Sequence, residues 1–303
     1  MPASPPSPAG EELTTARAVR RLQITSSRLT TADFAGEYRS AFRGRGIEFD
    51  QVREYQPGDD VRSIDWNVTA RQGRTFVKSF VEERELTLLL LLDRSASMDF
   101  GTVRATKLET AIEACSLLAF AALRSNDRIG LLTFGDGELR YLPPGKGKHH
   151  LLRLIRTAMT PATTGAPVAN LTDALDHLIH AVRGRVLTCI FSDFIDTLPA
   201  RPVAAVAARH DTVAVAVTDP AEHDLPPAGL LRLADAETGD LHMVDTDSDA
   251  VRADYRRQAA RRLTERRDAL TSTGTALLEL GSQTPPLYPL MRFFRNRQQR
   301  RRT

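Results

Sequence analysis

The pattern of apolar and polar residues changes near residue 86. Beyond that point, nearly continuous apolar runs of strand length alternate with longer segments whose apolar residues recur at helical spacing. The runs over 86–92, 128–134, 186–191, 212–217 and 276–280 predict strands, and the segments over 108–123, 149–159, 171–182, 249–270 and 287–297 predict helices. Because strands alternating with helices are typical of a parallel sheet covered on both faces, we expect a doubly wound, mostly parallel α/β sheet.

The chain before residue 86 lacks this alternation. Residues 1–30 open on a Pro/Ser/Ala-rich stretch, which predicts a disordered or partly helical segment. Residues 31–84 are rich in Arg, Asp, Gly and aromatic residues, with short alternating pieces that predict strands. We therefore expect an N-terminal segment over 1–30, a small β-rich segment over 31–84, the main α/β domain over 85–290 and a basic C-terminal tail over 291–303.

Charge is spread unevenly along the 303 residues. The chain has 41 basic and 38 acidic residues, and six of its arginines but no acidic residue lie within 291–303. Without these six charges, the net charge of +3 becomes −3 for the rest of the chain. The body of the chain therefore lacks the basic signature of nucleic-acid binding. We interpret the tail as a frayed, solvated end, with docking to an acidic protein, a membrane surface or RNA as the alternative.

Composition narrows the class of protein. With 42% hydrophobic and 26% charged residues, the chain is unlike collagen, disordered or disulfide-stapled proteins. Its apolar runs are far shorter than the ~18–20 residues of a membrane-spanning helix, and residues 1–10 lack a signal-peptide pattern. Cys115 and Cys189, the two cysteines, lie inside apolar runs and are expected to be buried as small hydrophobic side chains. We expect a cytoplasmic protein without a membrane span.

Polar side chains follow two of the predicted strands at the point where each strand ends. Asp93, Ser95 and Ser97 come directly after the first buried strand, and Asp193 follows a later one. The carboxyl ends of parallel strands meet at one edge of a sheet, where ligands of such folds bind. One carboxylate and two hydroxyls suit Mg²⁺, with Asp193 acting through a water molecule. The alternative is that the serines cap the following helix and that Asp93 accepts hydrogen bonds from loop amides.

This combination resembles the metal-ion-dependent adhesion site of von Willebrand factor type A domains. The resemblance implies a von Willebrand A-type, Rossmann-like core in which these four residues hold Mg²⁺, and in which an acidic residue of a partner completes the coordination of the metal. The family's threonine ligand precedes an Asn/Asp-Leu-x-x-Ala-Leu segment, which here occupies residues 170–175. Ala169 stands in the place of that threonine, so the resemblance implies a site that lacks one direct oxygen ligand.

A second resemblance covers residues 42–101 almost continuously. It rests on the motifs Gly44-Arg45-Gly46-Ile47-Glu48-Phe49, Arg53-Glu54-Tyr55, Pro57-Gly58-Asp59-Asp60, Ile64-Asp65-Trp66, Ala70-Arg71 and Glu82-Glu83-Arg84. Together they resemble the signature of domain-of-unknown-function family 58, which comprises bacterial proteins with a von Willebrand A-type core. Members typically sit beside MoxR-type AAA+ ATPases. The resemblance therefore implies a MoxR-type ATPase as partner, acting with this chain in protein-complex maturation.

The same region alternates arginines with acidic residues. The set consists of Arg53, Asp59, Asp60, Arg62, Asp65 and Arg71. Because guanidinium–carboxylate pairs fix geometry well, one interpretation is a structural network that holds the segment on the sheet. The other is a docking surface for the partner ATPase. We expect Trp66, the single tryptophan, to lie in the core.

The motifs of common enzyme classes are absent from the sequence. It has no G-x-x-x-x-G-K-[ST] phosphate-binding loop, no G-x-S-x-G elbow and no zinc-spaced group of His and Cys. We therefore expect a non-enzymatic adaptor that binds a protein partner through the metal-type loop. The alternatives are a metal-dependent phosphoester hydrolase and a von Willebrand A scaffold whose degenerate site binds no metal.

Overall fold

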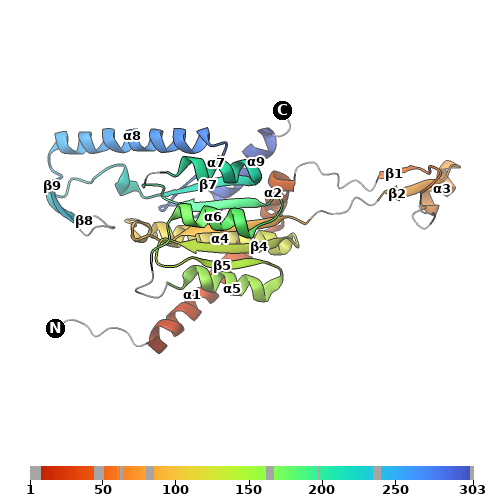
Figure 1. Cartoon of the computed structure of the whole chain (residues 1–303), viewed down its shortest axis with the longest axis horizontal. Coiled ribbons are helices and arrows are strands. Elements are labelled where there is room, and N and C mark those ends of the chain that lie inside the picture. The colour runs from red at the N-terminus through yellow and green to blue at the C-terminus, as the bar shows by residue number, and fades with distance from the viewer. Residues whose placement is uncertain are drawn as a thin grey trace. The chain divides into compact units, whose positions relative to one another are not determined.

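The computed structural model describes residues 8–43, 51–59, 61, 64–79, 85–161, 167–196, 198–234 and 240–300. The chain divides into two compact units (Figure 1). The main unit consists of Met1–Phe42 and Leu86–Thr303, and the inserted unit consists of Arg43–Glu85. Each unit is described by itself below.

A six-stranded sheet forms the centre of the main unit. Its strands are β3 (Thr87–Asp93), β4 (Arg128–Phe134), β5 (Arg140–Gly145), β6 (Leu187–Ser192), β7 (Asp211–Thr218) and β10 (Ala276–Gly281). They lie in the order β10-β7-β6-β3-β4-β5, and all neighbours are parallel except β4 and β5. This is the strand order of a doubly wound sheet, and its switch point lies between β3 and β6. The predicted fold class is confirmed.

Strand β3 is buried on both faces because its leucines alternate across the sheet. Leu88, Leu90 and Leu92 lie in one core cluster, and Leu89 and Leu91 lie in the other. All five side chains are fully buried. A parallel strand with helices on both sides needs an apolar residue at every position, which explains the continuous run in the sequence.

Helices cover both faces of this sheet (Figure 1). Buried residues of α4 (Lys107–Arg124), α5 (Gly147–Met159) and α9 (Leu287–Arg300) share the core cluster on one face. On the other face, α6 (Leu171–Ala181), α7 (Ala200–Arg209) and the end of α8 (Asp249–Ser272) contribute. None of the helices in the described part of the chain has the length and apolar character that crossing a membrane requires.

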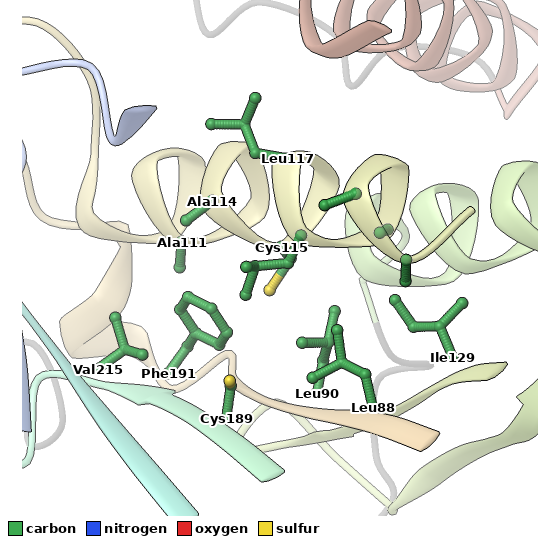
Figure 2. Close-up of a cluster of buried hydrophobic side chains, with 14 of the residues drawn as sticks. Leu88, Leu90, Ala111, Ala114, Cys115, Leu117, Ile129, Cys189, Phe191 and Val215 are labelled. Atoms are coloured by element: carbon green, nitrogen blue, oxygen red, sulfur yellow. The ribbon is translucent and has the colours of Figure 1, made fainter. Parts of the chain in front are cut away.

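Helix α4 is apolar on nearly all sides because it lies between the sheet and a second layer. It contacts strands of the sheet and also α1 (Pro8–Leu29), which packs on α4 and α5. Figure 2 shows Cys115 of α4 pointing towards Cys189 and Phe191 of β6, while Leu117 points the other way. Both cysteines are free thiols. Burial raises the pKa of the Cys189 thiol to about 12 and that of Cys115 well above its usual value.

The segment 31–84, expected to be β-rich, begins with a helix that belongs to the main unit. Residues Ala32–Arg43 form α2. Phe34, Tyr38 and Phe42 are spaced four apart, so they lie on one face of this helix, and all three pack in the core of the main unit. The boundary of the inserted unit therefore lies after Phe42 rather than near residue 31.

The C-terminal residues differ from the frayed tail that we expected. Helix α9 continues to Arg300, and its Leu290 and Phe294 are buried. The Phe294 ring lies 5.6 Å from Phe34 and 5.4 Å from Phe42, centroid to centroid. Arg295 pairs with Glu37, and Arg297 pairs with Asp211. Much of the tail's charge is therefore used within the fold.

The inserted unit contains a two-stranded antiparallel sheet and a short helix. Strands β1 (Gln51–Glu54) and β2 (Phe76–Ser79) pair in antiparallel fashion, and α3 (Trp66–Gln72) lies between them in the sequence. Asp65 caps α3 by accepting hydrogen bonds from the backbone of Asn67 and Val68. Trp66 is 70% exposed, so the prediction that it lies in the core is wrong.

The chain between β7 and α8 contains a separate two-stranded sheet. Strands β8 (Leu230–Ala234) and β9 (Leu241–Asp245) form an antiparallel pair. Two short 3₁₀ helices follow strands of the central sheet: η2 (Ala96–Asp99) comes after β3, and η3 (Pro220–Glu222) comes after β7.

Candidate functional site

Three buried aspartates stand at the carboxyl ends of neighbouring parallel strands. Asp93 ends β3, Asp193 follows β6, and Asp219 follows β7. Their exposed fractions are 7%, 3% and 0%. Asp93 and Asp193 flank the switch point of the sheet, which is the position where doubly wound folds bind ligands.

Asp93 is held by donors from two loops. Its Oδ1 accepts a hydrogen bond from the Ser95 amide at 2.9 Å, and its Oδ2 accepts one from Ser192 Oγ at 2.6 Å. Burial raises the pKa of the Asp93 carboxyl, and the nearby charge of Asp193 acts in the same direction. The hydrogen bonds from Ser192 and Ser95 oppose this rise without cancelling it.

The two serines after β3 lie beside this carboxylate. Ser95 Oγ and Ser97 Oγ are 3.2 Å apart, which is within hydrogen-bond distance. Gly135 permits this arrangement: its φ is +96°, and a Cβ there would lie 2.6 Å from the Ser95 amide nitrogen. The loop after β4 therefore passes close to the loop after β3, and Asp93, Ser95 and Ser97 come together as the spacing predicts.

Asp193 is paired with a lysine that the sequence interpretation did not include. Lys107 Nζ donates to Asp193 Oδ2 at 2.6 Å and also contacts the Glu222 carboxylate. The Lys107 side chain is only 1% exposed. On the other side of Asp193, the Ile195 amide donates to Oδ1 at 3.2 Å, and Arg266 donates to the backbone carbonyl. Asp193 is thus held in place by an ammonium group on one carboxylate oxygen and by a backbone amide on the other.

Asp219 has a different set of partners. It accepts hydrogen bonds from the Thr102 hydroxyl and the Ser282 hydroxyl, both at 2.5 Å, and from the amides of Thr102 and Ala221. Although burial alone would raise the pKa of Asp219, these hydrogen bonds outweigh it and hold the pKa below its usual value. Asp219 therefore ties the loops after β3, β7 and β10 together.

A pocket of about 470 Å³ opens at this edge of the sheet. Asp93, Ser95, Ser192 and Asp193 contribute to its polar wall. The exposed side chains of Val168 and Ile195 also line it, with 66% and 59% of their surfaces accessible. The pocket thus joins hydroxyl and carboxylate groups to apolar surface, a combination found in binding sites.

The side chains fit the predicted Mg²⁺ site only in part. Asp93, Ser95 and Ser97 offer three oxygen donors close together. Ala169 lines the pocket with a methyl group where the resemblance requires a threonine hydroxyl, and Asp193 already pairs with Lys107. The described part of the chain contains no group of three or more His, Cys, Asp or Glu side chains that could hold a metal ion. The four-residue Mg²⁺ set is therefore not fully matched, and the binding of a metal stays a prediction.

The predicted Arg–Asp set of the inserted unit is only partly described. Asp60 and Arg62 lie outside the described residues, and so does the side chain of Arg53. Asp59 accepts a hydrogen bond from the Gln56 amide at 2.9 Å, and Asp65 caps α3, so both carboxylates bind local backbone. Arg71 is exposed on α3. These two contacts contribute to a turn and a helix cap, and the predicted structural network or docking surface stays a prediction.

Lys107 and Asp219 could have been found from signals in the sequence. Asp219 follows a predicted apolar strand in the same way as Asp93 and Asp193 do. Lys107 is the first residue of α4, directly after the N-cap Thr106. A positive charge is unfavourable at a helix N-terminus, so a lysine there in an otherwise apolar helix indicates an acidic partner elsewhere.

Comparison with known proteins gives the relatives of this chain. The family described as "Protein of unknown function DUF58" matches residues 51–265. The uncharacterized protein Rv1480 of Mycobacterium tuberculosis is 34% identical over 284 residues, which cover 93% of this chain and 89% of that protein. The uncharacterized protein YeaD of Bacillus subtilis is 30% identical over 105 residues, which cover 35% of this chain and 24% of that protein.

Solved structures with some likeness have low sequence identity. The SpRpn10 VWA domain is 14% identical and has a TM-score of 0.37, with 70% of this chain and 95% of that chain covered. The PilB minor pilin from Streptococcus sanguinis is 11% identical and has a TM-score of 0.36, with 75% of this chain and 63% of that chain covered. The match over residues 51–265, together with the 34% identity to Rv1480, shows that the chain belongs to the DUF58 family.

Proposed function

We propose that this chain is a non-enzymatic protein-interaction module that binds its partner at the pocket on the carboxyl edge of the main sheet. The observation that carries the proposal is the arrangement of Ser95 and Ser97. Their hydroxyl oxygens lie 3.2 Å apart, and Ser95 lines the pocket together with Asp93 and exposed apolar side chains. Hydroxyls can donate and accept hydrogen bonds, and the apolar side chains offer contact area, so the pocket can hold a side chain of a partner.

The chemistry of the pocket favours binding over catalysis. The described residues that line it include serines and aspartates but no histidine, cysteine or lysine that could activate a serine. Both carboxylate oxygens of Asp93 accept hydrogen bonds, and Asp193 is paired with Lys107. These side chains are therefore held in place by structural contacts, which supports a rigid recognition surface. The Mg²⁺ predicted from the resemblance enters no step of this proposal.

The partner that we propose is a MoxR-type AAA+ ATPase, acting with this chain in the maturation of a protein complex. Its support is the family resemblance, to which membership of the DUF58 family adds weight. A companion of such an ATPase needs a surface that binds it, and a pocket without catalytic groups suits that role.

The test is a binding measurement with purified proteins. The double variant Ser95→Ala/Ser97→Ala removes the Ser95 hydroxyl from the pocket and the Ser97 hydroxyl that lies 3.2 Å from it, with little change in volume. We expect it to bind a MoxR-type ATPase from the same organism at least about tenfold more weakly than the native chain, which corresponds to about 1.4 kcal/mol. Isothermal titration calorimetry measures the difference. Ser272→Ala, at the exposed end of α8, is the matched control and should bind as the native chain does.

Two results would contradict the proposal. Native-like ATPase binding by the folded double variant would show that the pocket is not the binding surface. Turnover of p-nitrophenyl phosphate or bis-p-nitrophenyl phosphate with added Mg²⁺ or Mn²⁺, lost in the double variant, would instead favour the metal-dependent hydrolase. We expect no such turnover from the native chain.

A further inference from the structure

We propose that the Lys107 ammonium group, buried behind the Asp193 wall of this pocket, is the resident cation at this edge of the sheet and that the site therefore works without a divalent metal. The inference deepens the proposed function, because it concerns the same site, but its geometry stands independently of any partner. It begins from the burial of Lys107, whose side chain is 1% exposed. A lysine is almost never so deeply buried unless acidic groups pair with it.

Two carboxylates from different loops meet this ammonium group. Asp193, after β6, lies 2.6 Å from Nζ, and Glu222, at the end of η3, contacts Nζ as well. Glu222 is itself held because its other oxygen accepts from the Asp219 amide at 3.1 Å. The ammonium group thus joins helix α4 to the loops after β6 and β7, which are the loops that follow two adjacent strands of the sheet.

The position of Lys107 at the N-terminus of α4 is unfavourable for a positive charge. It is the first residue of the helix, where the exposed backbone amides repel a cation. Thr106 and Glu109 form a complete capping box at the same helix end, so the lysine is not needed to cap the helix. The two carboxylates must therefore account for its burial at this position.

A divalent ion would compete with Lys107 for the same carboxylate. To bind Asp193, it would have to displace the ammonium group or lie close to it, and two positive groups in a buried site repel each other strongly. The methyl group of Ala169 supplies no oxygen that could offset this cost. Lys107 is therefore a positioning residue: it fixes the Asp193 carboxylate and supplies the positive charge that a metal would bring.

Metal titrations of the native chain and of Lys107→Met test the inference. Methionine is similar in length to lysine but has no charge, so it removes the ammonium group from Asp193 and Glu222 and leaves the Arg266 guanidinium as their nearby positive charge. After treatment with EDTA, the native chain should show no saturable Mg²⁺ or Mn²⁺ binding by calorimetry or by Mn²⁺ paramagnetic resonance. Lys107→Met should melt at a lower temperature and regain stability with added metal, with an affinity for Mn²⁺ at least about tenfold above that of the native chain.

Controls separate a specific effect from general charge loss. Lys148→Met removes an exposed lysine from α5 and should behave as the native chain does. Lys107→Arg keeps a positive charge at the position and should stay insensitive to metal.

Saturable metal binding by the native chain below about 1 mM would overturn the inference. If Lys107→Met folds, a melting temperature and metal response like those of the native chain would overturn it as well. If that variant does not fold, the native titration alone decides. None of these measurements uses a partner. A failure of the ATPase experiment therefore does not affect this inference, and a failure of the metal titrations does not affect the proposed ATPase binding.

Discussion

Asp93, Asp193 and Asp219 occupy equivalent positions on three strands, but Asp193 differs from the other two in having a charged donor. Asp93 and Asp219 accept from hydroxyls and amides, whereas Asp193 accepts from an ammonium group and an amide. The direction of each resolved pKa shift follows from the balance between burial and donors: the pKa of Asp93 is raised and that of Asp219 is lowered.

The lowered pKa of Asp219 predicts a pH-dependent contribution to stability. Ionised Asp219 stabilises the fold above the unfolded-state pKa of about 3.9, and this contribution is lost as the pH falls through the lower folded-state value. Asp219→Asn should therefore lower the free energy of unfolding at pH 7 by about 1–3 kcal/mol, because it removes the charge and replaces one of the two oxygens that accept from Thr102 and Ser282 with an NH₂ donor. The difference from the native chain should shrink below about pH 4.

Guanidinium unfolding curves between pH 3 and pH 7 measure this difference. Asp224→Asn serves as the control, since Asp224 forms an exposed ion pair with Arg256, and such pairs contribute little. A gap between native and Asp219→Asn proteins that stays constant down to pH 3 would show that ionisation of Asp219 is not involved.

Among the site residues, the sequence could predict those that directly follow a strand, because the strand determines where they lie. Asp93, Ser95 and Ser97 follow one strand within five residues, and Asp193 follows another, so the topology of the sheet brings them together. Lys107 could not be assigned in the same way, because its partners lie 86 and 115 residues further along the chain. Ion pairs between residues so far apart in the sequence depend on how the loops pack in the folded protein. The periodicity of apolar residues gives no information about that packing.

Elements buried on both faces were the easiest to predict. Strands β3, β6 and β7 are nearly continuous apolar runs, and their bounds agree closely with the predicted ones. Strand β5 was not predicted, because it contains Pro143 and Pro144 and lies at the antiparallel edge of the sheet. Edge strands tolerate proline and need only one paired side, so they lack the apolar run that marks a central strand.

Helix α9 was predicted over residues 287–297 from the spacing of its apolar side chains, although its arginines were also interpreted as part of a solvated tail. The structure contains this helix, and Leu290 and Phe294 face the core. Phe294 packs against Phe34, Tyr38 and Phe42 of α2. The arginines lie on the remaining surface, where Arg295 and Arg297 pair with acidic residues.

Removing the Phe294 ring should therefore destabilise the main unit substantially. Phe294→Ala is expected to lower the free energy of unfolding by about 3–5 kcal/mol, because the side chain is 1% exposed and leaves a cavity among three aromatic rings. Tyr288→Ala, on the same helix but 72% exposed, should change it by less than about 0.5 kcal/mol. Urea denaturation of the two variants gives the comparison, and equal effects would argue against a buried α9.

For the whole molecule, the main feature is that one compact unit interrupts the sequence of another. Phe42 and Leu86 both pack in the core of the main unit, and residues 43–85 between them form the inserted unit. The sequence predicted the later boundary near residue 85, where the strand pattern begins. The earlier boundary was placed near 31 instead of 43, because a single amphipathic helix beside a region of different composition is easily counted with it.

The main unit should fold without the insert. Replacing residues 44–84 with a flexible Gly/Ser linker of about 15 residues keeps both anchoring residues, and the cost of closing such a loop changes slowly with its length. We expect one cooperative unfolding transition, with a free energy within about 1–2 kcal/mol of the native chain. Circular dichroism with thermal and urea denaturation provides the measurement.

A second, longer deletion serves as the comparison for this experiment. A second deletion that starts at residue 38 also removes Tyr38 and Phe42, which pack on Phe294. That protein should be much less stable than the first. Loss of cooperative folding in both deletions alike would show that the insert is needed for the core.

The packing of α2 against α9 also bears on how the protein is made. Phe34 and Tyr38 leave the ribosome long before Phe294, whose ring they surround. The nascent chain therefore carries an uncovered aromatic face while the insert and the central strands emerge. The main core cannot close until Phe294 has left the ribosome, so ribosome stalling or premature termination ahead of residue 294 would release a product that cannot complete it.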